Sequence, residues 1–152
     1  MTPDTPRRRV DPIRGWPTFV APLRGRRPFD AEVSLESESP VAPSEAVDDC
    51  PFCPGNEADL GEILSQWPPV DPGQPWGSRA VSNRYPFLAA RAWDAPGAAG
   101  RQEVLVDGPQ HEAVPPLQSH PQRRAVLEMW RARVRAAWER EDQGRGEGEI
   151  HL

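Results

Sequence analysis

The chain has 152 residues, of which 20 are proline and 37% are hydrophobic, and it carries a formal net charge of −5 at pH 7. This composition predicts one loop-rich domain with short strands and argues against a long helical bundle. The negative balance argues against a general nucleic-acid binder, and no apolar run approaches the roughly 18 residues that a membrane helix needs. Two cysteines make a poor disulfide framework for a secreted domain, so we expect a cytoplasmic protein.

The first half of the chain predicts one strand and several loops. Residues 1–10 are charged and have no apolar run after them, so we expect a flexible N-terminus and no secretory signal. Large apolar side chains predict a short strand in residues 15–22, and Pro17 confines it to the edge of a sheet. Residues 31–49 are rich in Ser, Glu and Pro and predict a linker, and residues 65–77 predict a proline-rich loop.

The second half predicts two strands and one helix. Residues 78–83 are typical of a weak strand, and the alternation in residues 102–108 predicts the best strand of the chain. Residues 119–142 predict a helix that begins with a capping box between Ser119 and Gln122. Apolar side chains recur along this helix at helical spacing and predict one buried face, made of Val126, Leu127, Trp130, Val134, Ala137 and Trp138.

The order of these elements indicates an α+β fold, in which several strands and long loops are followed by a late helix that packs on the sheet. We expect the folded domain to span residues 11–142. Residues 143–152 are polar and glycine-rich and predict a low-complexity tail.

The sequence CPFC contains both cysteines, Cys50 and Cys53. A catalytic dithiol at this spacing lies at a helix N-terminus, where the helix dipole lowers the thiol pKa. Here Pro-Gly-Asn follows at residues 54–56, which favours a tight turn and therefore a zinc knuckle over a redox site. The knuckle supplies two of four ligands. Of the three histidines, His111 is the best third candidate, because it follows the predicted strand at residues 102–108.

Four segments, in this order, are similar to the N-terminal half of galactose-1-phosphate uridylyltransferases, a family of the histidine-triad superfamily. They are DPIRGWPTFVAPLRGRRP, CPFCPGNE, WGSRAVSNRYPFL and QEVLVDGPQHEAVPPL. The resemblance implies a histidine-triad-like antiparallel sheet with a packed helix, here loop-rich and truncated.

The resemblance also implies a reaction and a cofactor. In this reaction of galactose metabolism, UMP moves from UDP-glucose to galactose 1-phosphate through a covalent uridylyl-histidine. The implied cofactor is Zn²⁺, with Cys50, Cys53 and His111 as three of its ligands.

Four further residues match the nucleotide-binding positions of that family. Arg24 and Arg27 match arginines that bind the nucleotide phosphates, a role suited to the planar fork of guanidinium donors. Asn83 matches an asparagine near the nucleotide, and Arg84 lies next to it at a position that varies within the family. UDP-glucose and galactose 1-phosphate are therefore the expected ligands, and we expect neither nucleic acid nor a membrane as a partner.

The sequence departs from the family at the nucleophile. The family's fourth zinc ligand and catalytic histidine lie in a His-Pro-His-Gly-Gln segment, which these 152 residues lack. We therefore expect an incomplete copy with no catalytic residue of its own, inactive alone. The alternatives are a non-catalytic, zinc-stabilised nucleotide-binding module, an adenylyl-transferring relative and a redox dithiol. A truncated sheet would expose an edge strand and favour association, as in a homodimer.

Overall fold

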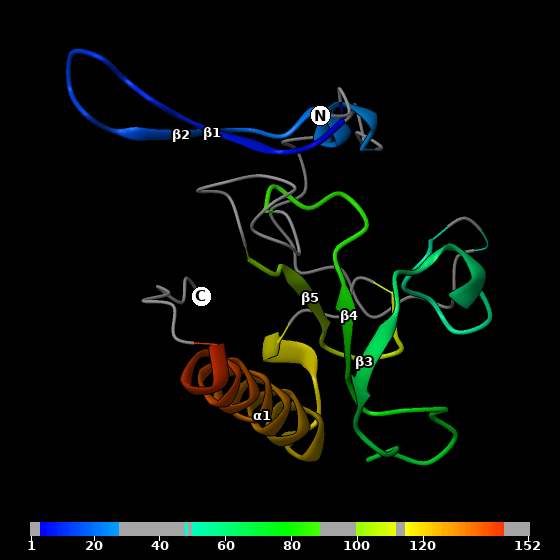
Figure 1. Ribbon diagram of the computed structural model, residues 1–152. Helices are drawn as coiled ribbons and strands as arrows, with labels where there is room; N and C mark the ends of the chain where they lie inside the picture. Colours follow the sequence, from blue (N-terminus) through cyan, green and yellow to red (C-terminus); the bar gives the residue numbers. More distant parts are fainter. Residues whose placement is uncertain (1–3, 28–47, 49, 89–99, 112–114, 145–152) are drawn as a thin grey trace. The chain divides into compact units, whose positions relative to one another are not determined.

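The computed structural model describes residues 4–27, 48, 50–88, 100–111 and 115–144, with the backbone alone for residues 140–144. Within these residues the chain is α+β, with two small sheets and one long helix (Figure 1). Most of the predicted linker and tail lie outside them. The elements in chain order are β1 (Arg7–Val10), β2 (Pro17–Val20), η1 (Pro22–Arg26), η2 (Glu57–Asp59), β3 (Ile63–Gln66), β4 (Arg79–Ser82), β5 (Glu103–Val106), η3 (Pro115–Leu117) and α1 (His120–Gly144).

The chain forms two compact units. One comprises Met1–Glu38 with Ser82–Val104, and the other comprises Ser39–Val81 with Leu105–Leu152. Among the described residues, the fully buried hydrophobic side chains all belong to the second unit: Cys53, Trp76, Ala80, Val81, Ala125 and Met129. The second unit therefore holds the hydrophobic core of the described structure.

The first unit begins with an antiparallel hairpin. Strand β1 pairs with β2 from Arg7 opposite Val20 to Val10 opposite Pro17, and the Asp11 carboxylate accepts backbone N–H groups from the turn between them. Proline occupies the first position of β2, as expected for an edge strand. The expectation of a flexible segment over residues 1–10 missed β1, because its Arg-Arg-Arg-Val sequence has no apolar alternation and all four residues are exposed.

The second sheet has the strand order β3-β4-β5. Strands β3 and β4 are antiparallel, with an irregularity in the register between Ile63 and Ser65. Strands β4 and β5 confirm the two strands predicted in the second half of the chain. The prediction of a loop from residue 65 was wrong at its start, because Ser65 and Gln66 belong to β3. This strand is half exposed and its short sequence has no apolar alternation to reveal it.

The helix α1 begins where the sequence predicted. The Ser119 hydroxyl accepts the backbone N–H of Gln122 at 3.2 Å, which is the expected N-terminal cap. The reciprocal half of the capping box was predicted incorrectly. The Gln122 side chain is buried and donates instead to the backbone carbonyls of Gly77 and Asp107. It therefore joins the start of α1 to the segments before β4 and after β5.

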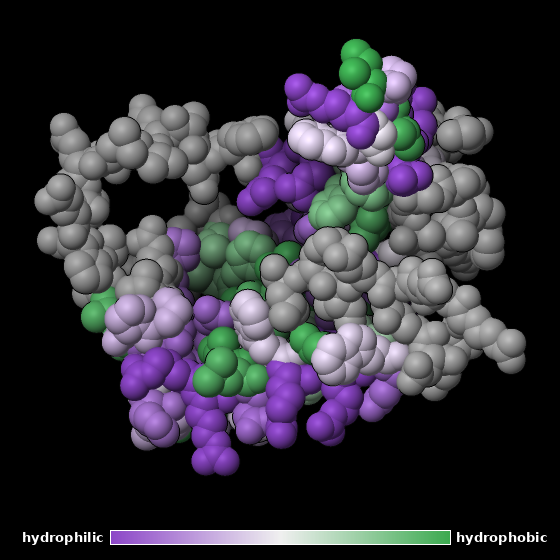
Figure 2. Space-filling view, turned by 90° about the vertical axis from the view of Figure 1, so that its left-hand side faces the viewer, coloured by the Kyte–Doolittle hydropathy of each residue, from purple (hydrophilic) through white to green (hydrophobic). Residues whose placement is uncertain are grey.

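The buried face of α1 differs from the predicted one. Gln122, Ala125 and Met129 are each 2% exposed or less, whereas Leu127 is 68% and Trp138 59% exposed. Trp130, also predicted to be buried, is 44% exposed. Gln122 faces the interior because its side chain donates to two backbone carbonyls. Ala125 and Met129, about one and two turns further along, lie on the same face of the helix and are therefore buried as well. The lower part of the surface in Figure 2 is largely purple, with a few isolated green residues.

Candidate metal centre

The cysteine knuckle consists of two successive turns. The backbone N–H of Cys53 donates to the carbonyl of Cys50 at 3.2 Å, and the N–H of Asn56 donates to the carbonyl of Cys53 at 3.3 Å. Gly55 has a φ of 97°, a backbone conformation that would be strained in a residue with a side chain. The Asn56 side-chain amide donates to the Cys50 carbonyl at 2.8 Å. The turn predicted from Pro-Gly-Asn is confirmed. Among the described residues around the knuckle, the one helical turn is the three-residue η2, which begins at Glu57, so Cys50 does not lie at the N-terminus of a described helix.

A loop after β5 brings His111 to this knuckle. Strand β5 ends at Val106, and the chain continues through buried Gly108 and Pro109 to His111. His111 Nδ1 lies 3.3 Å from Cys53 Sγ, although the two residues are 58 positions apart in the sequence. One ligand atom from each of Cys50, Cys53 and His111 lies within 4.8 Å of the other two.

The donor set fits a zinc ion. With Zn–S of about 2.3 Å and Zn–N of about 2.0–2.1 Å, a tetrahedral site places sulfur and nitrogen about 3.5 Å apart. The 3.3 Å between Cys53 Sγ and His111 Nδ1 is close to that spacing. Cys53 is buried, and Cys50 and His111 are half-buried. Within the described residues the cluster has three members, one fewer than a closed structural zinc site.

Two residues that the sequence analysis did not single out support the knuckle. Glu57 Oε2 accepts the backbone N–H of Gly55 at 2.9 Å, and its Oε1 accepts from the Arg79 guanidinium at 2.8 Å. The hydrogen bond from Arg79 lowers the pKa of Glu57 below its ordinary value. Glu57 is part of the CPGNE segment, but only the structure shows that it pairs with the first residue of β4.

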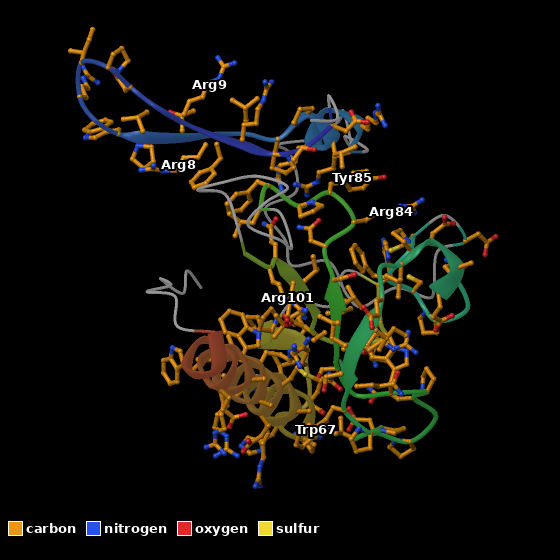
Figure 3. All side chains as sticks on the ribbon, viewed as in Figure 1. Arg8, Arg9, Trp67, Arg84, Tyr85 and Arg101 are labelled. Atoms are coloured by element: carbon orange, nitrogen blue, oxygen red, sulfur yellow. The ribbon has the colours of Figure 1, made fainter. Side chains whose placement is uncertain are left out.

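The predicted nucleotide-binding residues lie in the first unit, and two of them, Arg24 and Asn83, contact the backbone of Tyr85. Arg24 Nη1 donates to the Tyr85 carbonyl at 3.3 Å, and Asn83 Oδ1 accepts the Tyr85 N–H at 2.8 Å. Arg27 follows η1 and is exposed. Arg84 is also exposed, and Figure 3 shows its side chain beside that of Tyr85 on the loop after β4.

Comparison with known proteins found a likeness to a solved structure. No family model matches the chain. The chain is similar to the crystal structure of an ADP-glucose phosphorylase from Arabidopsis thaliana with bound ADP-glucose, with 23% sequence identity and a TM-score of 0.46. The match covers 88% of this chain and 38% of that chain, so the present chain spans under two fifths of that protein's length. In the described part of the chain, no helix is long and apolar enough to cross a membrane.

Proposed function

We propose that these residues form the metal-binding and phosphate-binding part of a hexose-1-phosphate nucleotidyltransferase similar to the galactose-1-phosphate uridylyltransferases. The meeting of Cys50, Cys53 and His111 within 4.8 Å carries this proposal. The four-segment resemblance implies that the same three residues are zinc ligands. The redox alternative is less favoured, because a redox dithiol would need no histidine beside Cys53.

The metal centre would hold Zn²⁺ through two thiolates and the His111 imidazole. When bound, zinc supplies a strong cross-link between the knuckle and the loop after β5, and its binding free energy adds to the folding free energy. The protein groups prepare this link. Gly55 permits the turn, the Asn56 amide closes it, and the half-buried positions of Cys50 and His111 leave access to the site.

The phosphate-binding part would be formed by Arg24 and Asn83, with Arg27 and Arg84 nearby in the sequence. A guanidinium carries five N–H donors, and one of those of Arg24 donates to the Tyr85 carbonyl. That hydrogen bond orients the planar fork and leaves further donors for a phosphate. The substrates we propose are UDP-glucose and galactose 1-phosphate, and an adenine nucleotide sugar is the alternative donor.

The proposed reaction transfers UMP from UDP-glucose to a histidine and then to galactose 1-phosphate. The resemblance assigns that histidine to a His-Pro-His-Gly-Gln segment, which these residues do not contain. Cys50, Cys53, His111 and Arg24 would therefore bind and position rather than react. A nucleotide-exchange assay on the 152-residue chain should give no turnover, and turnover would contradict the assignment of the nucleophile.

Zinc binding tests the centre directly. We expect one Zn²⁺ per chain, measured by metal analysis after removal of metal with a chelator and reloading. Cys50→Ser and His111→Ala should each abolish or strongly weaken binding. His120→Ala is the matched control, because His120 is exposed at the start of α1. Unchanged zinc affinity in both ligand variants would refute the proposed centre.

Calorimetry with UDP-glucose and with ADP-glucose tests the phosphate-binding part. Arg24→Gln should weaken binding of the preferred nucleotide sugar about tenfold or more, since hydrogen bonds to charged groups are worth about 1.5–3 kcal/mol. Arg26→Gln is the matched control, because Arg26 forms an exposed ion pair with Asp4. Equal losses in the two variants would mean that only net charge matters and that Arg24 has no binding role.

A further inference from the structure

Arg79, the first residue of β4, is a buried arginine that joins three segments of the second unit. Its Nε donates to Gln66 Oε1 on β3 at 2.7 Å, and its Nη1 donates to Glu57 Oε1 at 2.8 Å. Its guanidinium carbon lies 4.4 Å from the centre of the Trp76 ring, and the residue is 7% exposed. A buried charge is costly unless it is paired and hydrogen-bonded, so this guanidinium holds its partners in place.

Glu57 extends this arrangement to the knuckle. Its two carboxylate oxygens have different partners, Arg79 on one side and the backbone N–H of Gly55 on the other. Gly55 is two residues after Cys53 and has the positive φ that shapes the turn. The chain of contacts therefore runs from buried β4 through Arg79 and Glu57 to the backbone that follows the second thiol.

We propose that Glu57 and Arg79 are positioning residues of the Cys50, Cys53 and His111 centre, and that they raise its metal affinity by fixing the knuckle before the metal binds. This inference rests on the metal centre proposed above. A knuckle held in one conformation loses less conformational entropy on binding than a loose one. Outer partners of metal ligands typically contribute about 10–100-fold to metal affinity.

The test compares zinc affinities of full-chain variants, measured by competition with a chromogenic chelator. Glu57→Gln keeps the shape of the side chain but replaces one acceptor oxygen with an NH₂ donor, so it loses one of the two contacts. Arg79→Lys keeps the charge but loses the fork that reaches both Gln66 and Glu57. We expect each variant to bind zinc about 10–100-fold more weakly than the wild type.

Glu128→Gln is the matched control. It removes the Glu128–Arg131 ion pair, 2.6 Å long, from the surface of α1, and its zinc affinity should match that of the wild type within about twofold. The Co²⁺ absorption spectrum provides a second readout. The thiolate bands of Glu57→Gln should keep their positions at saturation, since the ligands are unchanged, but should need more Co²⁺ to reach full intensity.

The outcomes separate this inference from the proposal on which it rests. If the wild type binds no zinc, the metal centre itself is refuted. If the wild type binds zinc and folded Glu57→Gln binds it equally well, only the positioning role is refuted. If metal-free Glu57→Gln is less stable than the wild type but its zinc affinity is unchanged, the Glu57–Arg79 ion pair has a structural role only. If Arg79→Lys does not fold, the affinity of Glu57→Gln decides.

Discussion

Truncation of Met129 tests which face of α1 is buried. Met129 is 1% exposed, and replacing a buried methionine with alanine costs about 2–5 kcal/mol through lost transfer free energy and the remaining cavity. Leu127, two residues earlier, is 68% exposed. Full burial of a leucine contributes about 1.5–3 kcal/mol, so the third that is buried here contributes about 0.5–1 kcal/mol. Met129→Ala should therefore destabilise the chain by at least about 1 kcal/mol more than Leu127→Ala.

Urea unfolding in the presence of a chelator, followed by circular dichroism, measures both free energies of unfolding. Methionine and leucine have nearly the same helix propensity, so the change to alanine affects the helix itself equally at the two positions. The difference therefore reports packing. Equal losses, or a larger loss for Leu127→Ala, would refute the observed orientation of α1. That result would favour the face predicted from sequence, on which Leu127 lies with Trp130 and Trp138.

Three further substitutions have defined outcomes. In Gly77→Ala the new Cβ would lie 2.5 Å from the Pro68 carbonyl oxygen, and the resulting backbone shift should cost about 1–3 kcal/mol in thermal unfolding. Gln122→Leu leaves the Gly77 and Asp107 carbonyls without their donor, so the free energy of unfolding in urea should fall by about 1–3 kcal/mol for each group left unsatisfied. Burial raises the pKa of Asp107, so its charged form opposes folding above the folded-state pKa. Asp107→Asn should stabilise the chain at pH 7, and this gain should vanish as the pH falls below 3.8, the ordinary value of this carboxyl.

The two cysteines of the candidate metal centre could be predicted from sequence because the signals that mark them are local. The spacing of Cys50 and Cys53 and the turn-forming residues after them define a knuckle without any tertiary information. His111 needed the resemblance as well as the strand before it, since a histidine in a loop gives a weak signal alone. The structure brings all three together. The contact between Arg79 and Glu57 could not be predicted from a local pattern, because the two residues are 22 positions apart in the sequence.

Strands β1 and β3 were not predicted from the sequence. Both are recognised by their backbone pairing and not by buried side chains. In β1 all four residues are exposed, and in β3 the end residues Ile63 and Gln66 are exposed. Neither strand shows the alternation that reveals a half-buried strand. The face of α1 was missed for a related reason. The apolar spacing predicted that Leu127 is buried and gave no reason to bury Gln122. In the structure Gln122 is buried because its side chain donates to two backbone carbonyls.

Residues 76–80 form a continuous buried segment that connects the helix with the knuckle. The Gly77 carbonyl accepts from the Gln122 side chain, the Ser78 hydroxyl donates to the Ala125 carbonyl at 3.5 Å, and Arg79 binds Glu57. Packing of α1 and order in the knuckle therefore depend on the same stretch of backbone.

Zinc that binds only the folded chain adds about 2.7 kcal/mol of stability at a free concentration 100-fold above its Kd. This is comparable to the expected loss in Met129→Ala, so saturating zinc should restore much of the stability of that variant. It should restore none in Cys50→Ser, which loses a ligand, and urea unfolding with and without zinc measures both. Zinc that stabilises Cys50→Ser as much as Met129→Ala would show that the metal acts elsewhere than at the Cys50, Cys53 and His111 centre.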